Sequence, residues 1–549
     1  MSILQKLRFN APIHSIGGAA MIIASAGIAS RLFGFLRDRI LASQFGAGDT
    51  LDAYYAAFRI PDLLYSFLVL GALSAAFIPV FTELYVHKKE DEAWELASAL
   101  LHSLIFSLGV LSILAAICMH PLMSILVPGF SPEKRELTEH FTRIMLLSPI
   151  FLGMSAVFGG VLVSLKRFVL YSIAPIFYNV GIIFGAVVFV PYFGAIGLAW
   201  GVVLGAVFHA CIQYIDLKSS GFIYKPVYFG FFTNDSVRRV MLLMIPRSLA
   251  MAINQISFLV VTIFASTLMS GSLAVFSFAN NIQSIPLGLF GVAFSLAVFP
   301  SLSALAAKEA HDEFFTIFAI TFRRILFFVL PVSVLMLVLR AQIVRVLLGS
   351  GQFDWTDTIA TFGVLGILSI SLFAQSLIPL LARAFFAIQN TRTPLYIALV
   401  SEACHIAFIF LFIGKHGING LALAFSLATI INMALLYIFL RRHFAHAWKD
   451  AHIFTPSLKI IFASVVTGIV AQFTKMAFGF NNNELDTFVA IFTQMIVTVF
   501  VGMSVFVVIS WYLHIEEFVN IKNFFMRKLL GQPQNLVEAE EETASGNMR

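Results

Sequence analysis

The sequence predicts an all-α, polytopic membrane protein with fourteen transmembrane helices, arranged as two parallel six-helix bundles followed by a C-terminal helix pair. Composition is the first observation behind this prediction. Of the 549 residues, 59% are hydrophobic and only 12% are charged, against roughly 25% charged in a soluble domain. The mean hydropathy is +0.92. The formal net charge of +6 does not indicate nucleic-acid binding, because basic residues of membrane proteins collect in cytoplasmic loops.

The second observation is a series of apolar segments of about 20 residues or more, the length that a helix needs to cross a bilayer. They lie near residues 16–42, 52–84, 94–119, 137–164, 169–192, 195–217, 236–267, 271–304, 316–339, 356–387, 393–413, 417–440, 456–477 and 487–514. The second and eighth are long enough to kink, and Pro61 and Pro286 supply kink sites. The first follows Lys6 and Arg8, but it is too long for a signal peptide, so we expect an uncleaved helix.

Loop charges predict the orientation of these spans. If the N-terminus lies in the cytoplasm, most basic loop residues are cytoplasmic, which favours fourteen spans with both termini inside. The opposite side then receives only a few basic residues, namely Lys134, Arg135, Arg340, Arg345, Lys415 and Lys475. The residues after Leu530 are rich in glutamate and small polar side chains, and we expect a disordered cytoplasmic tail there.

The third observation is an internal repeat. Ala72, Ser74, Ala76, Pro79 and Asp91 recur in the same order and at one constant offset as Ala293, Ser295, Ala297, Pro300 and Asp312, and Gly194-Ala-Ile-Gly197 returns at nearly the same offset as Gly417-Ile-Asn-Gly420. Each copy holds six helices, an even number, so both copies begin on the same side of the membrane, as in transporters that rock around a central site. The predicted parts are two six-helix bundles, a helix pair and a tail, at residues 1–225, 226–450, 451–520 and 521–549.

Charged residues inside the first two spans are candidates for function. Arg31 lies within the first span and Arg37 near its end, and Asp52 and Arg59 lie in the second. A charge in the hydrocarbon costs a few kcal/mol and is usually tolerated only when it faces a cavity. These residues therefore either line a chamber that attracts anions or pair with one another as structural ion bridges. Arg247 in the seventh span is either a further cavity cation or a side chain that snorkels to the cytoplasmic interface.

Other polar residues leave two interpretations open. Asn254 and Gln255 form either hydrogen bonds between helices or substrate contacts. Glu402 and His405 share a helix face, and they are either a satisfied polar pair or a proton or ion site. No metalloprotease, P-loop or nucleophile-elbow motif is present, and the thirteen histidines do not cluster at metal-ligand spacing. The sequence therefore predicts no enzyme, no metal site and no cofactor.

Several motifs carry a resemblance to a known family. They are Ser30-Arg31-Leu-Phe-Gly34-Phe-Leu-Arg37-Asp38, Phe45-Gly46-Ala47-Gly48, Asp52-Ala-Tyr-Tyr, Phe58-Arg59-Ile-Pro61-Asp62-Leu-Leu and Gly71-Ala-Leu-Ser-Ala-Ala-Phe77-Ile-Pro79, then Pro286-Leu-Gly-Leu-Phe-Gly291 and Arg383-Ala-Phe-Phe-Ala387. In these stretches the chain resembles the MurJ/MviN lipid II flippases of the MOP superfamily, from about residue 15 to 515. The superfamily also includes multidrug exporters and polysaccharide-unit flippases.

The resemblance implies that the chain moves lipid II, a peptidoglycan precursor for the cell wall, from the inner to the outer leaflet of the bacterial cytoplasmic membrane by alternating access. This lipid-linked oligosaccharide pyrophosphate and the bilayer would be its partners; whether a coupling ion takes part is left open. Guanidinium groups suit pyrophosphate because they present a fixed fork of donors. The resemblance therefore assigns substrate binding to Arg31 and Arg37, with Asp52 orienting the arginines or helping release, and Arg59 joins them as a basic residue where the family has one.

The chain departs from the family in its second and eighth spans. Asn281 and Ser284 take the places of an arginine and of a glutamate or glutamine in the eighth span, so these two candidate substrate contacts are neutral. Tyr65, Ser66 and Leu70 replace two arginines and a glutamate in the second. The predicted cavity charge is thus concentrated in the first half. Two alternatives stay open: an exporter of another polyprenyl-linked glycan, and a non-transporting envelope scaffold.

Overall fold

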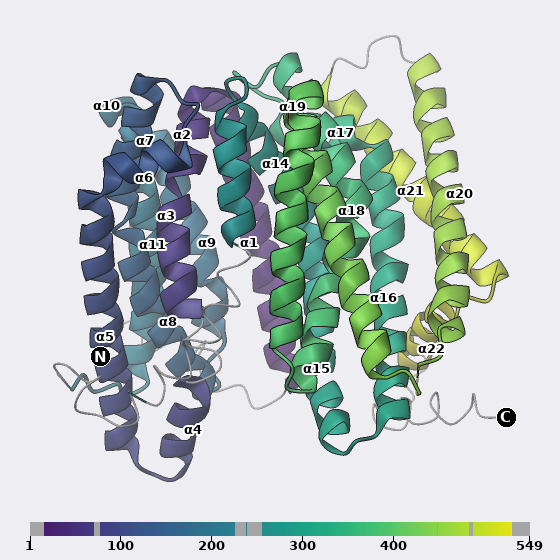
Figure 1. Ribbon diagram of the computed structural model, residues 1–549, viewed down its shortest axis with the longest axis horizontal. Helices are drawn as coiled ribbons and strands as arrows, with labels where there is room; N and C mark the ends of the chain where they lie inside the picture. Colours follow the sequence, from purple (N-terminus) through teal and green to yellow (C-terminus); the bar gives the residue numbers. More distant parts are fainter. Residues whose placement is uncertain are drawn as a thin grey trace. The chain divides into compact units, whose positions relative to one another are not determined.

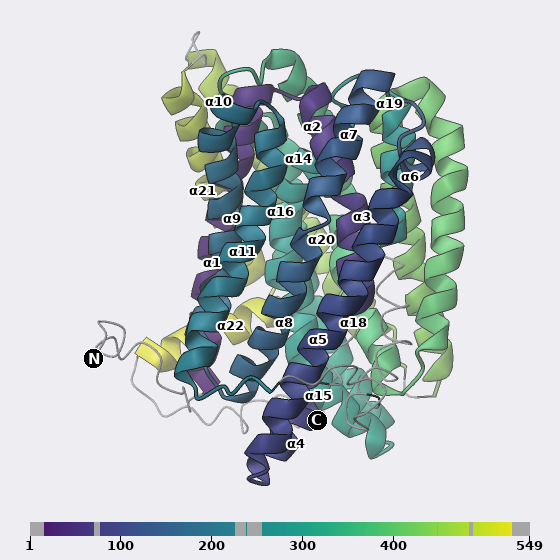
Figure 2. The ribbon, with the colours of Figure 1, turned by 90° about the vertical axis from the view of Figure 1, so that its left-hand side faces the viewer.

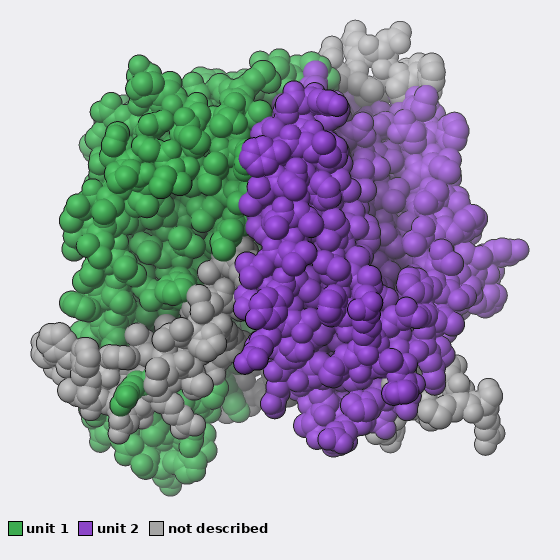
Figure 3. Space-filling view, in the orientation of Figure 1, with its two compact units in different colours: residues 1–277, 347–357 green, residues 278–346, 358–549 purple. Residues whose placement is uncertain are grey.

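A computed structural model of the chain describes residues 16–70, 77–225, 238, 255–446, 448–481 and 487–529 (Figure 1). Within these ranges the chain forms helices and no strand, which confirms the all-α fold class. Contacts divide the chain into two compact units (Figure 3). Unit 1 comprises residues 1–277 and 347–357, and unit 2 comprises residues 278–346 and 358–549. The repeat instead assigns residues 226–277 to the second bundle, and those bundle boundaries stay a prediction.

In the described part of the chain, ten helices are long and apolar enough to cross a membrane. One of them, α19, carries two predicted spans, joined at Gly417, whose backbone is not helical. The second predicted span is not one continuous helix: α2 ends at Ala57, α3 begins at Arg59, and Pro61 lies in its first turn. Proline lacks the amide hydrogen that a continuous helix would use, which explains a break at this point. The count of fourteen spans stays a prediction.

Unit 1 is built from helices that pack along their lengths. Its described helices are α1 (Ile16–Phe45), α2 (Asp49–Ala57), α3 (Arg59–Tyr65), the π-helix η3 (Ser66–Leu70), α4 (Ile78–Val86), α5 (Glu90–Ile117), α6 (Met119–Leu126), α7 (Pro132–Met145), α8 (Ser148–Ser164), α9 (Val169–Phe184), η5 (Gly185–Phe189), α10 (Val190–Phe193), α11 (Ile196–Ser219) and an unlabelled helix, Gln255–Ser266. Helix α11 packs on α8 and α9, α1 packs on α9, and α5 packs on α8 (Figure 2). A core of buried apolar side chains, including Phe77, Phe81 and Trp94, joins α4, α5 and α8.

Unit 2 contains most of α14, α17 and α18 and the whole of the other later labelled helices. They are α14 (Ser272–Pro286), η6 (Leu287–Val292), α15 (Ala293–Ala307), α16 (His311–Val338), α17 (Arg340–Leu348), α18 (Trp355–Ala387), α19 (Arg392–His443), α20 (Ala451–Asn481), α21 (Phe488–Tyr512) and α22 (Glu516–Leu529). The first turns of α14 and α18 and the end of α17 group with unit 1. Helix α20 packs on α16 and α21, and Phe327, Ile460 and Phe506 meet in their core.

Backbone geometry repeats with the offsets that the sequence predicts. Among the described residues, five non-glycine residues have positive φ, and four of them form two pairs. Lys88 and Glu309 are separated by the offset of the first repeated motif, and Lys166 and Gln389 by the offset of the second. L-residues rarely adopt this conformation, so its recurrence at matching positions supports duplication of the six-helix unit.

The predicted glycine repeat shows the same correspondence. Gly194 and Gly417 both have positive φ, at 63° and 53°. A Cβ added three residues later, at Gly197 or Gly420, would lie 2.6 Å from Phe189 C or 2.5 Å from Phe412 O. Phe189 and Phe412 are themselves separated by the same offset as the two glycine motifs. These glycines therefore allow the same sharp reversal between helices in each copy.

Glycine pairs bring two helices of unit 1 into backbone contact. A Cβ at Gly181 would lie 2.3 Å from the Cα of Gly205, and a Cβ at Gly185 would lie 2.3 Å from the Cα of Gly201. Gly181 of α9 and Gly185, the first residue of η5, are four residues apart, as are Gly201 and Gly205 of α11, so each pair lies on one face. Small residues at this spacing allow close packing of membrane helices, where van der Waals contact replaces the hydrophobic effect.

Gly181→Ala is therefore expected to lower the free energy of unfolding by about 1–3 kcal/mol, because the methyl group has no room against the backbone of α11. Thermal unfolding of the purified protein in detergent would measure this change. Gly109→Ala, in α5, is the control, since its Cβ would meet nothing within 4 Å and alanine is the better helix former. Equal melting temperatures for the two variants would contradict the packing argument.

Candidate functional site

The arginine at the end of α1 is held by polar partners. Arg37 donates from Nε and Nη2 to Asp38 Oδ1, at 3.0 and 2.8 Å, and from Nη1 to Asn179 Oδ1 of α9 at 3.1 Å. The side chain of Arg37 is 22% exposed. Arg31 is half-buried and lies seven residues before Asp38, two helical turns away on the same face. For Arg37 the structure thus shows the ion bridge that the sequence left as one interpretation.

Arg59 begins α3 and faces the helix Gln255–Ser266. Its Nε donates to Thr262 Oγ1 at 2.8 Å, and its guanidinium carbon lies 5.4 Å from the centroid of the Phe258 ring. Arginine has five N–H donors, and among the described residues this is the one hydrogen bond that the guanidinium makes. Its remaining four donors have no hydrogen-bond partner among those residues. On the same helix, Gln255 donates to Ser66 Oγ at 2.8 Å. This contact agrees with the interpretation that Gln255 forms a hydrogen bond between helices.

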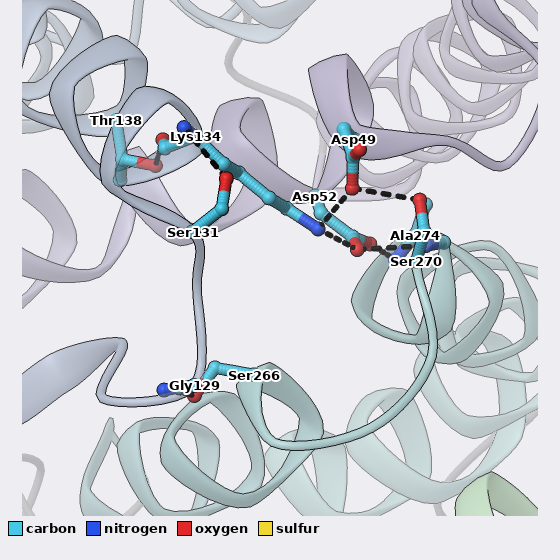
Figure 4. Close-up of polar contacts among 10 residues, drawn as sticks. Asp49, Asp52, Gly129, Ser131, Lys134, Thr138, Ser266, Ser270 and Ala274 are labelled. Carbon is cyan, nitrogen blue, oxygen red and sulfur yellow. Dashed lines mark hydrogen bonds and ion pairs between the residues drawn. The ribbon is translucent and has the colours of Figure 1, made fainter.

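Asp52 is the buried centre of a polar cluster in which its charged partner is a lysine (Figure 4). Lys134 Nζ donates to Asp52 Oδ2 at 2.7 Å and to Asp49 Oδ1 at 2.6 Å. The backbone N–H groups of Gly271 and Ala274 donate to the two carboxylate oxygens of Asp52, both at 2.8 Å. The side chains of Lys134 and Asp52 are 9% and 2% exposed. We call these five residues the clamp.

The clamp uses the electrostatics of a helix end. The first N–H groups of α14 have no partner within the helix, and its N-terminus carries partial positive charge. The Asp52 carboxylate satisfies these donors, while Lys134 neutralises the carboxylate from the other side. Lys134 reaches this position because Ser131 caps α7, where its hydroxyl oxygen accepts a hydrogen bond from the Lys134 N–H at 3.3 Å. The clamp therefore joins α2, α7 and the first turn of α14.

Close backbone contacts surround the clamp. Gly271 has a φ of +83°, and a Cβ there would lie 1.8 Å from Ala47 O. The N–H of Gly129 donates to Ser266 Oγ at 3.2 Å.

Partial burial acts to raise the pKa of Asp49, but the hydrogen bonds from Lys134 and Ser270 and the lysine charge outweigh it, so this pKa lies below its usual range. The resulting stabilisation is present above the ordinary pKa and is lost as the pH falls through the lowered one.

The candidates of the eighth span lie in unit 2, in the part of α14 that follows Ser277. Ser284 donates its hydroxyl to Asn281 O at 2.7 Å, within the same helix. Gln283, which the sequence did not single out as a site, exchanges amide hydrogen bonds with Gln375 of α18 at 3.1 and 3.3 Å. Arg247 lies outside the described residues. The site candidates of the first half, by contrast, all lie in unit 1.

Elsewhere in unit 2, His405 Nδ1 and Glu402 Oε1 lie 3.0 Å apart. This distance agrees with the interpretation that the two residues form a polar pair. In the described ranges no group of three or more His, Cys, Asp or Glu side chains could hold a metal ion.

Sequence reasoning missed Lys134, Asn179 and Thr262 as partners of the charged residues. Lys134 carried one signal, since it is among the few basic residues on the side that the orientation predicts to be poor in them. Asn179 and Thr262 carried none, because polar residues in apolar spans are common and their partners are distant in the sequence.

Comparison with known proteins decides the family. Residues 41–492 match the model of a family described as "Lipid II flippase MurJ". The chain belongs to this family. It is 30% identical over 451 residues to a "Probable lipid II flippase MurJ" of Bdellovibrio bacteriovorus, covering 81% of this chain and 86% of that protein. A protein of the same description from Buchnera aphidicola is 32% identical over 415 residues, covering 74% and 80%. The resemblance found in the sequence is thereby confirmed.

Solved structures show the same fold. One described as "Lipid II flippase MurJ, inward closed conformation" has a TM-score of 0.74 at 24% identity, covering 90% of this chain and 99% of that one. An inward-facing multidrug resistance MATE family transporter of the MOP superfamily has a TM-score of 0.63 at 17% identity, covering 78% and 98%. The protein is therefore a multi-pass membrane protein with the family's fold.

Proposed function

We propose that the protein flips lipid II across the bacterial cytoplasmic membrane by alternating access, with both termini in the cytoplasm. The observation that carries the proposal is the concentration of basic side chains on the spans of unit 1 of a chain that belongs to this family. Arg31, Arg37 and Arg59 would bind the pyrophosphate of the substrate, and Arg59 has four N–H donors that the described residues do not engage.

The clamp would close the outer end of the transport path. Under the proposed orientation, the turns before α2 and α7 face the outside, where Asp52 and Lys134 hold the first turn of α14. Asp52 would then act by stabilising this closed outer end, rather than by orienting the arginines or competing for them. Opening would require Asp52 to release two amide donors and a lysine.

The second half would contribute neutral hydrogen-bonding groups. Asn281 and Ser284 would contact the sugar or peptide of the headgroup, and Arg247 would add a cation. The membrane potential, negative on the cytoplasmic side, would favour outward movement of the anionic headgroup by about 2.3 kcal/mol per charge per 100 mV. A coupling ion is a further proposal, for which Glu402 and His405 are candidates.

Complementation tests this function. A bacterium depleted of its own lipid II flippase would receive the unmodified chain, Arg31→Ala or Arg392→Ala, at matched membrane levels. We expect growth with the unmodified chain and with Arg392→Ala, whose arginine is exposed at the start of α19, but no growth with Arg31→Ala. Full rescue by Arg31→Ala would remove Arg31 from the site. Failure of the unmodified chain, despite normal insertion, would favour another polyprenyl-linked glycan or a scaffold role.

A further inference from the structure

A cavity lies where α19 ends and the connection to α20 begins. Its volume is about 430 Å³, and Ile438, Arg441, Arg442, Ala445 and Trp448 line it. All five belong to unit 2, and none belongs to the candidate site described above. We call this cavity the α19–α20 pocket.

One of its two arginines is held in place by a chain of polar contacts. Arg441 Nη2 lies 2.5 Å from Asp450 Oδ2. The other carboxylate oxygen of Asp450 accepts from the hydroxyl of Tyr437 at 3.2 Å, and that hydroxyl accepts from Trp448 Nε1 at 3.3 Å. The network links the Arg441 guanidinium through Asp450 and Tyr437 to the indole of Trp448, so that Asp450 compensates the charge of this arginine.

The second arginine has no anionic partner among the described residues. Arg442 is exposed, and its guanidinium carbon lies 5.8 Å from the ring centroid of Phe439. In the part of the chain that the structure describes, no carboxylate lies within 4.0 Å of it. Because Asp450 compensates Arg441 alone, the lining of the pocket carries one uncompensated positive charge.

The pocket lies at the boundary between apolar and polar protein surface. Just before the arginines, Ile438 and Phe439 are each 42% exposed, and after the connection Phe454 and Leu458 are 53% and 63% exposed. Exposed apolar side chains on spanning helices face lipid tails, whereas arginine and tryptophan gather at headgroup level. Trp448 lies between these two apolar stretches. The pocket therefore lies at the depth of lipid headgroups.

We propose that the α19–α20 pocket binds the phosphate diester of an anionic glycerophospholipid, with the acyl chains lying over the apolar side chains beside it. Arg441 and Arg442 supply the donors that suit phosphate oxygens. Ala445 and the indole of Trp448 contact the glycerol region, and Ile438 and Phe454 contact the start of the chains. Basic residues directly beside the end of a membrane-spanning helix attract anionic lipid headgroups.

Two features favour a phospholipid over a soluble anion. A soluble phosphate would make no apolar contact with the exposed apolar residues on both sides of the arginines. The single uncompensated charge also matches a singly charged phosphate diester better than a pyrophosphate. The binding proposed here does not depend on flipping of lipid II, and the two can fail separately.

The test measures lipid binding to the purified full-length protein in detergent. Phosphatidylglycerol and phosphatidylcholine carrying a fluorescent acyl chain are titrated against the unmodified chain, Arg442→Gln and Lys449→Gln. Lys449 is exposed in the same connection but does not line the pocket, so its variant removes an equal charge. We expect phosphatidylglycerol to bind more tightly than phosphatidylcholine, and Arg442→Gln to weaken phosphatidylglycerol alone by about tenfold, the effect of one charged hydrogen bond. Lys449→Gln should leave both affinities unchanged.

Several outcomes would overturn the proposal. One is equal phosphatidylglycerol affinity in Arg442→Gln and the unmodified chain; another is an equal loss in Lys449→Gln, which would indicate diffuse surface charge. Displacement of the lipid by inorganic pyrophosphate would assign the pocket to a soluble anion, and stronger displacement by a polyprenyl pyrophosphate than by phosphatidylglycerol would assign it to a transport substrate. Melting temperatures without added lipid verify that Arg442→Gln is folded.

Discussion

Asp52→Asn is expected to abolish most transport, because it leaves Lys134 buried with one acidic partner instead of two. Breaking a buried ion pair by removing one partner costs about 3–5 kcal/mol. Since every 1.4 kcal/mol is a factor of ten, the population of the clamped state relative to the open state would fall by a factor of about 10² to 4 × 10³. The rate at which lipid II reaches the far leaflet of proteoliposomes measures the effect on transport. Labelling of Ser266→Cys, in a background without the native cysteines, reports opening of the clamp.

A double variant separates the charge pair from general damage. If Asp52 and Lys134 act together, the loss of transport in the double variant Lys134→Met/Asp52→Asn should be smaller than the sum of the losses in the two single variants. Expressed as a free energy, we expect this difference to be about 0.5–3 kcal/mol. Lys415→Met is the matched control, because Lys415 is exposed and is predicted to lie on the same side of the membrane. Additive effects of the two substitutions would show that the clamp does not function as a pair.

Arg59→Gln is expected to reduce lipid II transport by about 10–100-fold, the effect of losing a hydrogen-bonded charge at roughly 1.5–3 kcal/mol. Arg59→Lys should retain part of the activity, since it keeps the charge but loses the planar fork. The transport rate in proteoliposomes measures both. Guanidinium groups stay charged at any working pH, so binding through them should not change between about pH 5 and 9.

Thr262→Val separates the role of Arg59 in binding from its role in packing. This substitution removes the hydrogen bond to Arg59 Nε and leaves the positive charge. Its effect on transport should therefore be smaller than that of Arg59→Gln. If the two variants were equally defective, Arg59 would act by holding the helix Gln255–Ser266 rather than by contacting the substrate.

The sequence predicted those parts of the fold that depend on local pattern. Helix type followed from apolar segments, and duplication followed from motifs such as those at Gly194 and Gly417, where the structure shows the same positive φ. The break between α2 and α3 was harder to predict, because an apolar segment with one proline is compatible with either a kink or an interruption.

The sequence predicts the charged residues of the candidate site but not their partners, and the difference has a physical reason. The positions of Arg31, Arg37, Asp52 and Arg59 are visible as charges within apolar sequence. Their partners are not, since a partner is set by packing: Lys134 is 82 residues from Asp52, and Thr262 is 203 residues from Arg59. The charge of Lys134 predicts a loop position, whereas the structure buries its side chain at the start of α7.

On the α14 side, the clamp consists of backbone. Gly271 and Ala274 offer Asp52 their N–H groups, and every residue except proline carries such a donor. Side-chain replacement at Ala274 would therefore leave the donor intact, whereas replacement of Asp52 or Lys134 removes its contribution at once. A genetic screen for loss of function would accordingly identify Asp52, Lys134 and also Gly271, where an added Cβ would collide with Ala47 O, but it would miss Ala274. Proline at position 274 is the substitution that would reveal the contribution of that donor.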